Sequence, residues 1–293
     1  MAPRLTKTRG DTAEADLVPR IWMSVDVEPD ITEHLRGSFY GIEEGLPRLL
    51  ALLDRLAVPS DFFVLGEVAE KYPDLVRDLA SRGHTVGSHG HRHEYLCTGS
   101  PLEQEELIRR SVAAVEDVTG SRIIHFRAPN FSANGTTVRA LENAGIRYDS
   151  SVLPGRFKKK WRVQTVYDHR RAPRTPYRPS RLDISRADGS RLWEIPVTEN
   201  PFQKGTPIGL GFLNSRSVEQ TLSAVAQSEG KYAAFLVHPW ELIDLPVREQ
   251  TLPHWLEEAC RSDLSRLEGF LRLARERWGF TTAAEITSEL GER

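Results

Sequence analysis

Short apolar segments alternate with amphipathic ones along most of this chain, and this alternation restricts its fold more than any other feature. Residues 21–27 and 60–65 are apolar runs of strand length. Between them, over 43–57, leucines recur every three or four residues, which is the one-sided stripe of a helix packed on a sheet. A succession of strand, helix, strand and helix favours a parallel α/β architecture over a helical bundle or a sandwich.

The same alternation continues to the C-terminus. Ser100, Pro101 and Glu103 form a strong helix start, with an N-cap serine, a proline at N1 and a capping-box glutamate. We expect further helices over 67–81, 100–119, 135–143, 214–228 and 255–278, and further strands over 84–86, 123–126, 145–154, 192–197 and 233–237. The length permits either two small domains or one large α/β barrel. Because no linker or repeat interrupts the pattern, we expect a single domain over 21–293, preceded by a polar tail over 1–20.

Bulk composition excludes several classes of protein. The 293 residues carry a formal net charge of -2, which gives no general reason to expect nucleic-acid binding. No apolar run reaches the roughly 18 residues that a transmembrane helix needs. The polar first 20 residues resemble neither a signal peptide nor an anchor, so we expect a cytoplasmic protein. Cys97 and Cys260 are far apart and are expected to be free thiols.

Four histidines are concentrated in a glycine-rich stretch over 83–96, namely His84, His89, His91 and His93. His89 and His93 stand four residues apart, so one helical turn would place them side by side. Paired imidazoles are half of a typical site for zinc or a similar divalent metal. In such a turn His91 would point away from His89 and His93, and would either support these ligands from behind or lie at the surface. A solvated loop that is merely rich in histidine explains this spacing equally simply.

Polar side chains also follow several of the predicted strands. Asp26 and Glu28 lie on one face at the end of the strand over 21–27, where buried carboxylates are costly unless they are paired or bind a cation. Arg127, Asp149 and His238 follow three later strands. In a parallel barrel the carboxyl ends of the strands meet at one rim, where functional groups gather. Each residue also has a simpler interpretation, as a surface turn or a capped structural residue.

The segment over 155–182 has a different composition. Ten lysines and arginines lie between positions 156 and 181 against one acid, Asp168, with tyrosines, prolines and Trp161 among them. We expect a long loop over the mouth of the barrel, serving either as a solvated insertion or as a phosphate-binding lid. In the second case Arg170 and Arg171 would bind the anion. Trp161 and Trp240 are expected either to stack on the substrate or to be ordinary aromatic residues of the core or rim.

Taken together, these motifs resemble the polysaccharide deacetylases of the NodB-homology group, carbohydrate esterase family 4. The resemblance rests on five motifs in order: Asp26-Val27-Glu28, Ser88-His89 with His93, Arg127-Ala128-Pro129, Asp149, and His238-Pro239. It implies a distorted (β/α)7-type barrel with one divalent metal ion. It also implies an enzyme that removes acyl groups, usually from the amide nitrogen of N-acetylated sugars.

The resemblance implies a role for each matched residue. Asp26 corresponds to the catalytic base, with Arg127 as its partner. Glu28, His89 and His93 correspond to the metal ligands, which suit zinc, with cobalt, nickel or iron as alternatives.

His238 corresponds to the catalytic acid, and Asp149 to the residue that orients it. Pro129, Phe131 and Trp240 are expected to contact the substrate. This sequence departs from the family in two ways: Val27 separates the two acids of the first motif, and the usual tryptophan-rich pattern around Asp149 is missing.

The basic segment favours a phosphorylated substrate, such as an amino sugar linked to a nucleotide or to a lipid phosphate. A cationic rim would also favour peripheral contact with an anionic membrane surface. Two alternatives stay open. One is a hydrolase of cyclic imides or ureides, because relatives with a D-x-E motif open such rings, and the other is a non-catalytic carbohydrate-binding protein. The sequence does not indicate an oligomeric state.

Overall fold

The computed structural model describes residues 19–30, 37–160, 164–244 and 253–291. Eight strands form one parallel sheet in the order β10-β1-β2-β3-β4-β5-β8, with β9 paired to β1. These strands are β1 (Arg20–Val27), β2 (Asp61–Val64), β3 (Thr85–Ser88), β4 (His125–Phe126), β5 (Tyr148–Asp149), β8 (Trp193–Glu194), β9 (Tyr232–Val237) and β10 (Phe280–Thr281).

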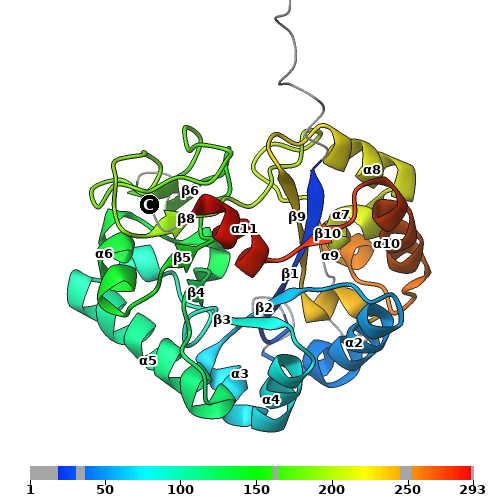
Figure 1. Ribbon diagram of the computed structural model, residues 1–293, viewed down its shortest axis with the longest axis horizontal. Coiled ribbons are helices and arrows are strands. Elements are labelled where there is room, and N and C mark those ends of the chain that lie inside the picture. The colour runs from blue at the N-terminus through cyan, green and yellow to red at the C-terminus, as the bar shows by residue number, and fades with distance from the viewer. Residues whose placement is uncertain (1–18, 31–36, 161–163, 245–252, 292–293) are drawn as a thin grey trace, which may run out of the picture.

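Helices surround the strands on the outside of the curved sheet (Figure 1). They are α2 (Leu46–Arg55), α3 (Gly66–Lys71), α4 (Pro73–Ser81), α5 (Pro101–Thr119), α6 (Gly135–Asn143), α7 (Leu210–Ser215), α8 (Val218–Ala226), α9 (His254–Ala259), α10 (Ser265–Arg277) and α11 (Ala283–Leu290). No helix in the described ranges is long and apolar enough to cross a membrane.

Strand β1 lies at the centre of the sheet and sets the position of the site. It pairs with β9 over most of its length, with β2 at its end and with β10 at its start. Ile21, Met23 and Val25 belong to the main core, whereas Trp22 packs in a second cluster on the opposite face. Because side chains alternate along a strand, Asp26 points to the same face as Trp22, toward the inside of the barrel.

The barrel closes without a continuous ladder between β8 and β9. Instead, the backbone N–H of Ala234 donates to Thr198 Oγ1 at 2.8 Å, and that of Leu236 donates to the Ile208 carbonyl at 3.0 Å. An irregular segment thus replaces one strand pairing. This confirms the predicted distorted (β/α)7-type barrel.

Several predicted boundaries were wrong for identifiable reasons. The helix expected over 67–81 divides into α3 and α4 at Pro73, which lacks an N–H for the helical ladder. The helix expected over 255–278 divides into α9 and α10. Asp263, which precedes the second helix, accepts from the backbone and hydroxyl of Ser265, its first residue. Residues 1–18 of the predicted tail lie outside the described residues, and β1 already begins at Arg20.

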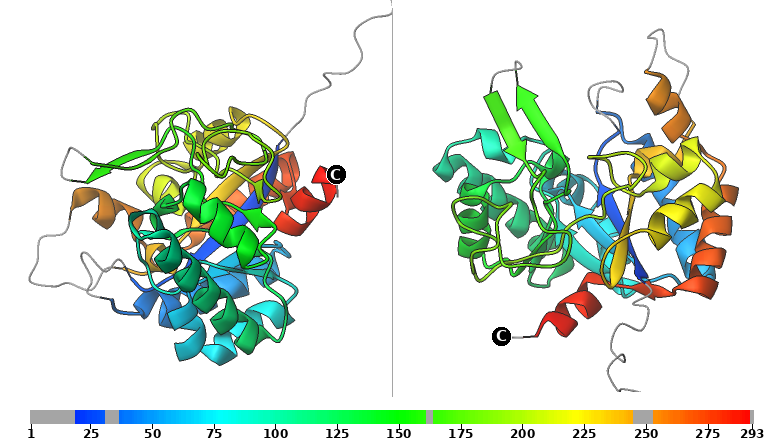
Figure 2. Two further views of the ribbon diagram at one scale, coloured as in Figure 1. Left: turned by 90° about the vertical axis from the view of Figure 1, so that its left-hand side faces the viewer. Right: turned by 90° about the horizontal axis from the view of Figure 1, so that it is seen from above.

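The basic segment also differs from the predicted loop. It contains an antiparallel hairpin of β6 (Phe157–Lys160) and β7 (Gln164–Asp168). Figure 2 shows this hairpin projecting from one end of the barrel. The cluster of cations hid the strand pattern, because charge rather than alternation dominates this stretch of sequence.

The capping box of α5 provides a test of this local analysis. Ser100 Oγ accepts from the backbone N–H of Glu103, whose carboxylate accepts from the backbone N–H of Ser100 at 2.7 Å. Ser100→Ala should lower the free energy of unfolding by about 1 kcal/mol, measured by urea denaturation. Glu105→Ala, at an exposed position of the same helix, is the matched control. Equal stability of the two variants would contradict the capping role.

Candidate active site

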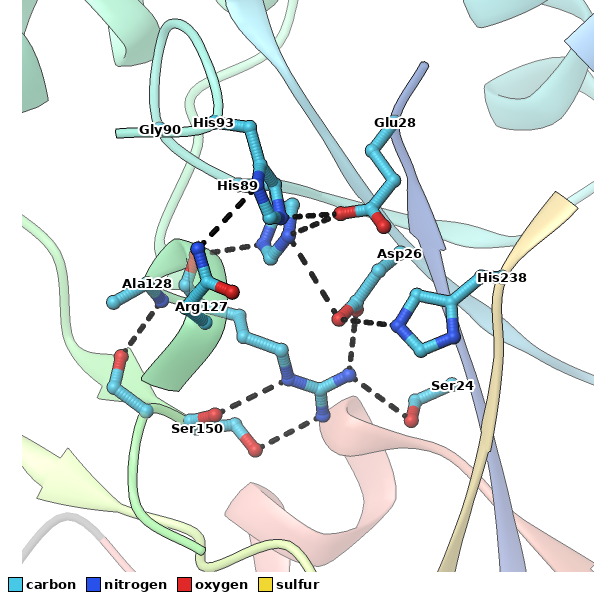
Figure 3. A network of polar contacts seen from close by, with 12 residues as sticks. Ser24, Asp26, Glu28, His89, Gly90, His93, Arg127, Ala128, Ser150 and His238 are labelled. Carbon is cyan, nitrogen blue, oxygen red and sulfur yellow. Dashed lines mark hydrogen bonds and ion pairs between the residues drawn. The ribbon is translucent and has the colours of Figure 1, made fainter. Parts of the chain in front are cut away.

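Three predicted metal ligands converge at the carboxyl ends of β1 and β3. Glu28 follows β1, and His89 follows β3 directly. The Nε2 atoms of His89 and His93 lie 3.3 and 2.8 Å from Oε2 of Glu28 (Figure 3). One ligand atom from each of these residues lies within 4.8 Å of the others.

The two histidines reach this position through a loop, not through the helical turn that the spacing predicted. Gly90, with φ of +87°, turns the chain directly after His89. The Gly90 carbonyl accepts from Gly66 N at 2.9 Å, which ties the loop to the start of α3. His91 is buried, and a Cβ on Gly66 would lie 2.4 Å from its Nδ1. It therefore packs against α3 and does not lie at the surface.

The hydrogen bonds behind these ligands fit them for a divalent cation. His89 Nδ1 lies 2.9 Å from the Arg127 carbonyl, so donation from Nδ1 leaves the Nε2 lone pair facing Glu28. Trp240 Nε1 donates to Glu28 Oε1 at 3.0 Å. Among the described residues, buried Oε2 then faces only the two imidazoles. Two imidazole nitrogens and one carboxylate oxygen form a donor set that suits zinc, cobalt, nickel or iron.

The charge state of Glu28 agrees with this role. Burial alone would raise the pKa of its carboxyl, but the neighbouring His93 and His89 hold that pKa well below its usual value. The carboxylate is therefore ionised at neutral pH. An ionised, buried carboxylate between two imidazoles is an environment that a cation would stabilise.

Asp26 lies beside the ligands and is held by Arg127. Arg127 Nη1 donates to Asp26 Oδ1 at 2.7 Å and to Ser24 Oγ at 3.1 Å. The fully buried guanidinium also donates to the carbonyl and hydroxyl oxygens of Ser150 at 3.1 and 3.0 Å. This leaves Asp26 Oδ2 facing the site, 3.8 Å from His89 Nε2 and 4.0 Å from His238 Nε2.

His238 faces Asp26 from the end of β9. Its Nδ1 lies 3.3 Å from Glu241 Oε2, and its ring stacks on Trp240 with centroids 4.8 Å apart. Burial lowers the pKa of His238, but the carboxylates of Glu241, Glu28 and Asp26 outweigh it and raise the pKa to about 9. These carboxylates therefore favour the imidazolium form of His238, whose Nε2 lies on the side of Asp26.

The carboxylate beside Nδ1 of His238 is that of Glu241, whereas Asp149, the predicted partner, contacts other residues. Asp149 Oδ1 accepts from Ser151 Oγ at 2.5 Å, and its carboxyl interacts with that of Glu194. Burial and this like-charged neighbour raise the pKa of Glu194, and burial raises that of Asp149 to about 6. One proton shared by the pair would relieve the repulsion.

The sequence did contain a signal for Glu241. His238-Pro239-Trp240-Glu241 has the form of a capping box, in which a glutamate at N3 returns to the N-cap residue. Glu241 Oε2 accepts from the backbone N–H of His238 at 2.8 Å, and this bond brings the carboxylate next to the imidazole.

A cavity of about 430 Å³ opens above these groups. The predicted substrate residues Phe131 and Trp240 line it, together with Tyr95, Asn130, Arg156, Lys158 and Trp255. Predicted Pro129 instead packs behind the wall, where a Cβ on Gly90 would lie 3.1 Å from its ring. Trp161 lies outside the described residues.

The prediction that Arg170 and Arg171 line this pocket was wrong. Both line a separate cavity beyond hairpin β6–β7. Arg170 pairs with Asp168 through Nη2 and Oδ2 at 2.6 Å and packs on Phe157. The basic segment contributes Arg156 and Lys158 to the pocket instead, because these positions lie at the base of β6.

Backbone strain marks the wall opposite His238. Asn130 and Phe131 have φ values of +56° and +57°, and both line the pocket. Two successive non-glycine residues in the left-handed region cost about 1–3 kcal/mol each. Such conformations gather at functional sites, and here they direct the Phe131 ring into the cavity.

Part of this chain matches a known protein family. The polysaccharide deacetylase family matches residues 19–148. This part of the chain is therefore similar to that family. The matched part contains Asp26, the three ligands and Arg127, whereas His238 and Glu241 lie beyond it.

Individual relatives agree with the family match. A peptidoglycan deacetylase of Helicobacter pylori is 31% identical over 122 residues, which are 42% of this chain and 41% of the relative. A peptidoglycan deacetylase-like protein of Gibberella zeae is 26% identical over 200 residues, 65% of this chain and 59% of the relative. The chain thus spans about half the length of these curated relatives.

The fold extends further than the sequence match. A crystal structure from Mycobacterium smegmatis, described as a polysaccharide deacetylase, superposes with a TM-score of 0.62 at 21% identity. The superposition covers 98% of this chain and 94% of that one. The whole barrel, including β9 with His238 at its end, therefore has the fold of that protein.

The ligand assignment predicts a specific loss of metal. His89→Ala and His93→Ala should each reduce bound divalent metal from about one equivalent to near zero, because two remaining donors hold such a cation poorly. Elemental analysis after dialysis measures the content. His254→Ala, on an exposed side chain, is the control and should retain it. Full metal content in both site variants would contradict the assignment.

The Glu241 contact predicts a change in titration. Glu241→Gln should lower the pKa of His238 below the wild-type value of about 9, because it removes the nearest negative charge. The pKa of His238 is higher in the folded protein than the value of about 6.5 in the unfolded chain, so protonation of this ring stabilises the fold. The stabilisation is complete below a pH of about 6.5 and is lost as the pH rises through about 9. NMR titration of the His238 ring measures the shift. An unchanged pKa would contradict the pairing.

Proposed function

We propose that this protein is a metal-dependent hydrolase that removes an N-acyl group, acetyl or formyl, from an amino sugar. The observation that carries the proposal is the position of Asp26. One of its carboxylate oxygens is fixed by Arg127, while the other faces both a metal ligand and His238. A base, an acid and a metal donor set thus share one cavity. The matching family and the relatives named as deacetylases support the same reaction.

The reaction divides among the residues of the site. Glu28, His89 and His93 would hold the cation, which supplies Lewis acidity toward an amide carbonyl and toward water. Asp26 Oδ2 accepts the proton of the attacking water, and Arg127 keeps that oxygen directed at the pocket by engaging Oδ1.

His238 completes the cleavage. Water adds to the carbonyl carbon, the carbon–nitrogen bond breaks, and Nε2 of the imidazolium protonates the departing amine. Without this proton the amine is a poor leaving group at neutral pH. Glu241 stabilises the imidazolium through Nδ1, so its role is to orient the His238 ring and to keep it protonated.

The lining of the pocket supports a sugar substrate with an anionic group. Exposed Trp255 offers aromatic surface on which a sugar ring can stack, and buried Phe131 and Trp240 add apolar lining. Arg156 and Lys158 add two cations at the same cavity. These cations favour an amino sugar linked to a phosphate, such as a nucleotide or a lipid phosphate.

Replacing the base tests the reaction itself. Asp26→Asn should lower kcat by about 10²- to 10⁴-fold, the usual contribution of a general base. Metal content should stay close to wild type, because the ligands are untouched. Thermal unfolding should shift to a lower temperature, because the amide leaves the buried Arg127 guanidinium without its charged partner. Acetate and formate release from N-acyl sugars, nucleotide sugars and cyclic ureides is the measurement. Ring opening without acid release would contradict a deacylase, and undiminished turnover would contradict the role of Asp26.

Variants of two neighbouring lysines distinguish a direct contact with an anionic group of the substrate from a general effect of positive charge. Lys158 lines the pocket, whereas Lys159 on the same strand lies over Phe157. Lys158→Ala should raise KM for a nucleotide-linked amino sugar about tenfold, equivalent to 1.4 kcal/mol, and leave KM for a neutral one unchanged. Lys159→Ala is the matched control. Equal effects of Lys158→Ala on both substrates would exclude a phosphate contact at this position.

A further inference from the structure

Two buried carboxyl groups lie side by side at the ends of neighbouring strands, and neither lines the reaction pocket. Asp149 ends β5 and Glu194 ends β8, and the parallel pairing of these strands places the two residues in register. Side chains in register on adjacent strands point to the same face of the sheet. Both residues are buried, so water does not screen one carboxyl from the other. We call Asp149 and Glu194 the carboxyl pair.

Backbone and hydroxyl donors satisfy three of the four oxygens of the carboxyl pair. Glu194 Oε1 accepts from the backbone N–H of Val152 at 2.9 Å, and Glu194 Oε2 accepts from that of Ser151 at 3.4 Å. Asp149 Oδ1 accepts from Ser151 Oγ at 2.5 Å. Buried Asp149 Oδ2 has no donor among the described residues, and its neighbour there is the Glu194 carboxyl. A proton held between the two carboxyls would supply the missing hydrogen bond.

Two tyrosines and Arg127 face the carboxyl pair, and none of them donates to Asp149 Oδ2. Tyr177 forms a backbone bridge with Glu194, but its hydroxyl donates to a backbone carbonyl at 2.7 Å. The Tyr232 hydroxyl, from β9, also donates to a backbone carbonyl, at 3.1 Å. The positive charge of Arg127 favours one carboxylate, whereas two buried carboxylates would repel each other. Burial raises the pKa of both carboxyls, which agrees with one proton on the pair.

The carboxyl pair is connected to the reaction pocket through the turn that follows β5. The Ser151 hydroxyl, besides donating to the pair, accepts from the backbone N–H of Ala128 at 2.8 Å. Ser150 accepts from the Arg127 guanidinium through its carbonyl and hydroxyl oxygens (Figure 3). The pair therefore holds the turn that binds Arg127, and Arg127 donates to Oδ1 of Asp26.

We propose that Asp149 and Glu194 share one proton and act together as positioning residues for Arg127, and through Arg127 for the base Asp26. In this state one carboxyl donates to the other, and the remaining oxygens bind the turn after β5. Without the proton, two buried negative charges would repel each other and displace Ser150 from the guanidinium. The positioning role rests on the proposed function, because it acts on the proposed base, whereas the shared proton does not depend on any reaction.

Infrared spectroscopy detects the shared proton without turnover. The carbonyl stretch of a protonated carboxyl is separate from the bands of a carboxylate. The difference spectrum between wild type and Glu194→Gln at neutral pH should contain this band, because the amide replaces the acid as donor to Asp149 and leaves that carboxyl ionised. Glu105→Gln, the same substitution at an exposed position of α5, is the matched control and should retain the band. A difference spectrum for Glu194→Gln without the band would overturn the proposal.

The NMR signal of the Arg127 Nε–H group tests the positioning role, because this group donates to the Ser150 carbonyl. Arg127→Lys removes the signal and so assigns it. Glu194→Met keeps a side chain of similar length but offers neither a proton nor an acceptor. It should therefore move the Arg127 signal and lower kcat at least about tenfold with little change in KM. Glu194→Gln should restore the signal and most of kcat.

A further variant keeps the test decisive if Glu194→Met does not fold. Ser151→Ala removes the contacts with Asp149 and with the backbone of Ala128, and it should move the same Arg127 signal. An unchanged signal in the folded variants at positions 194 and 151 would overturn the positioning role. Absence of acid release by the wild type would contradict the proposed function alone, since the infrared band and the Arg127 signal are measured without substrate.

Discussion

The ion pair between Arg127 and Asp26 is the interaction on which the rest of the site depends. Arg127 is fully buried, and an unpaired guanidinium in that position would be very costly. Its donors engage Asp26, Ser24 and Ser150, which come from β1 and from the residue after β5. Its carbonyl also fixes His89. One residue thus connects three strands with the proposed base, Asp26, and a proposed metal ligand, His89.

The places of several candidate site residues in the fold could be predicted from the sequence. Asp26, Glu28, Arg127 and His238 all follow strands, and a parallel barrel brings the ends of its strands to one rim. The alternation of strands and helices was therefore enough to predict that these four residues lie near the same rim. Local geometry was less accessible: the spacing of His89 and His93 indicated a helical turn, but Gly90 forms a loop with the same result.

Contacts that depend on loops could not be predicted in the same way. Glu241 reaches His238 through a short turn after β9, and Asp149 turns instead toward Glu194. Charge alone placed Arg170 and Arg171 at the pocket, yet the hairpin carries them to the far side. Periodicity records which face of an element is buried, whereas the path of a long insertion depends on pairings between distant residues.

The central claim is that Glu28, His89 and His93 hold one divalent cation beside Asp26. Anomalous diffraction from crystals of the metal-loaded protein, recorded on both sides of the zinc absorption edge, tests it most directly. The account predicts one anomalous peak per chain, bonded to Nε2 of both histidines and to Oε2 of Glu28. A peak at any other set of side chains, or none at a saturating concentration of metal, would contradict it.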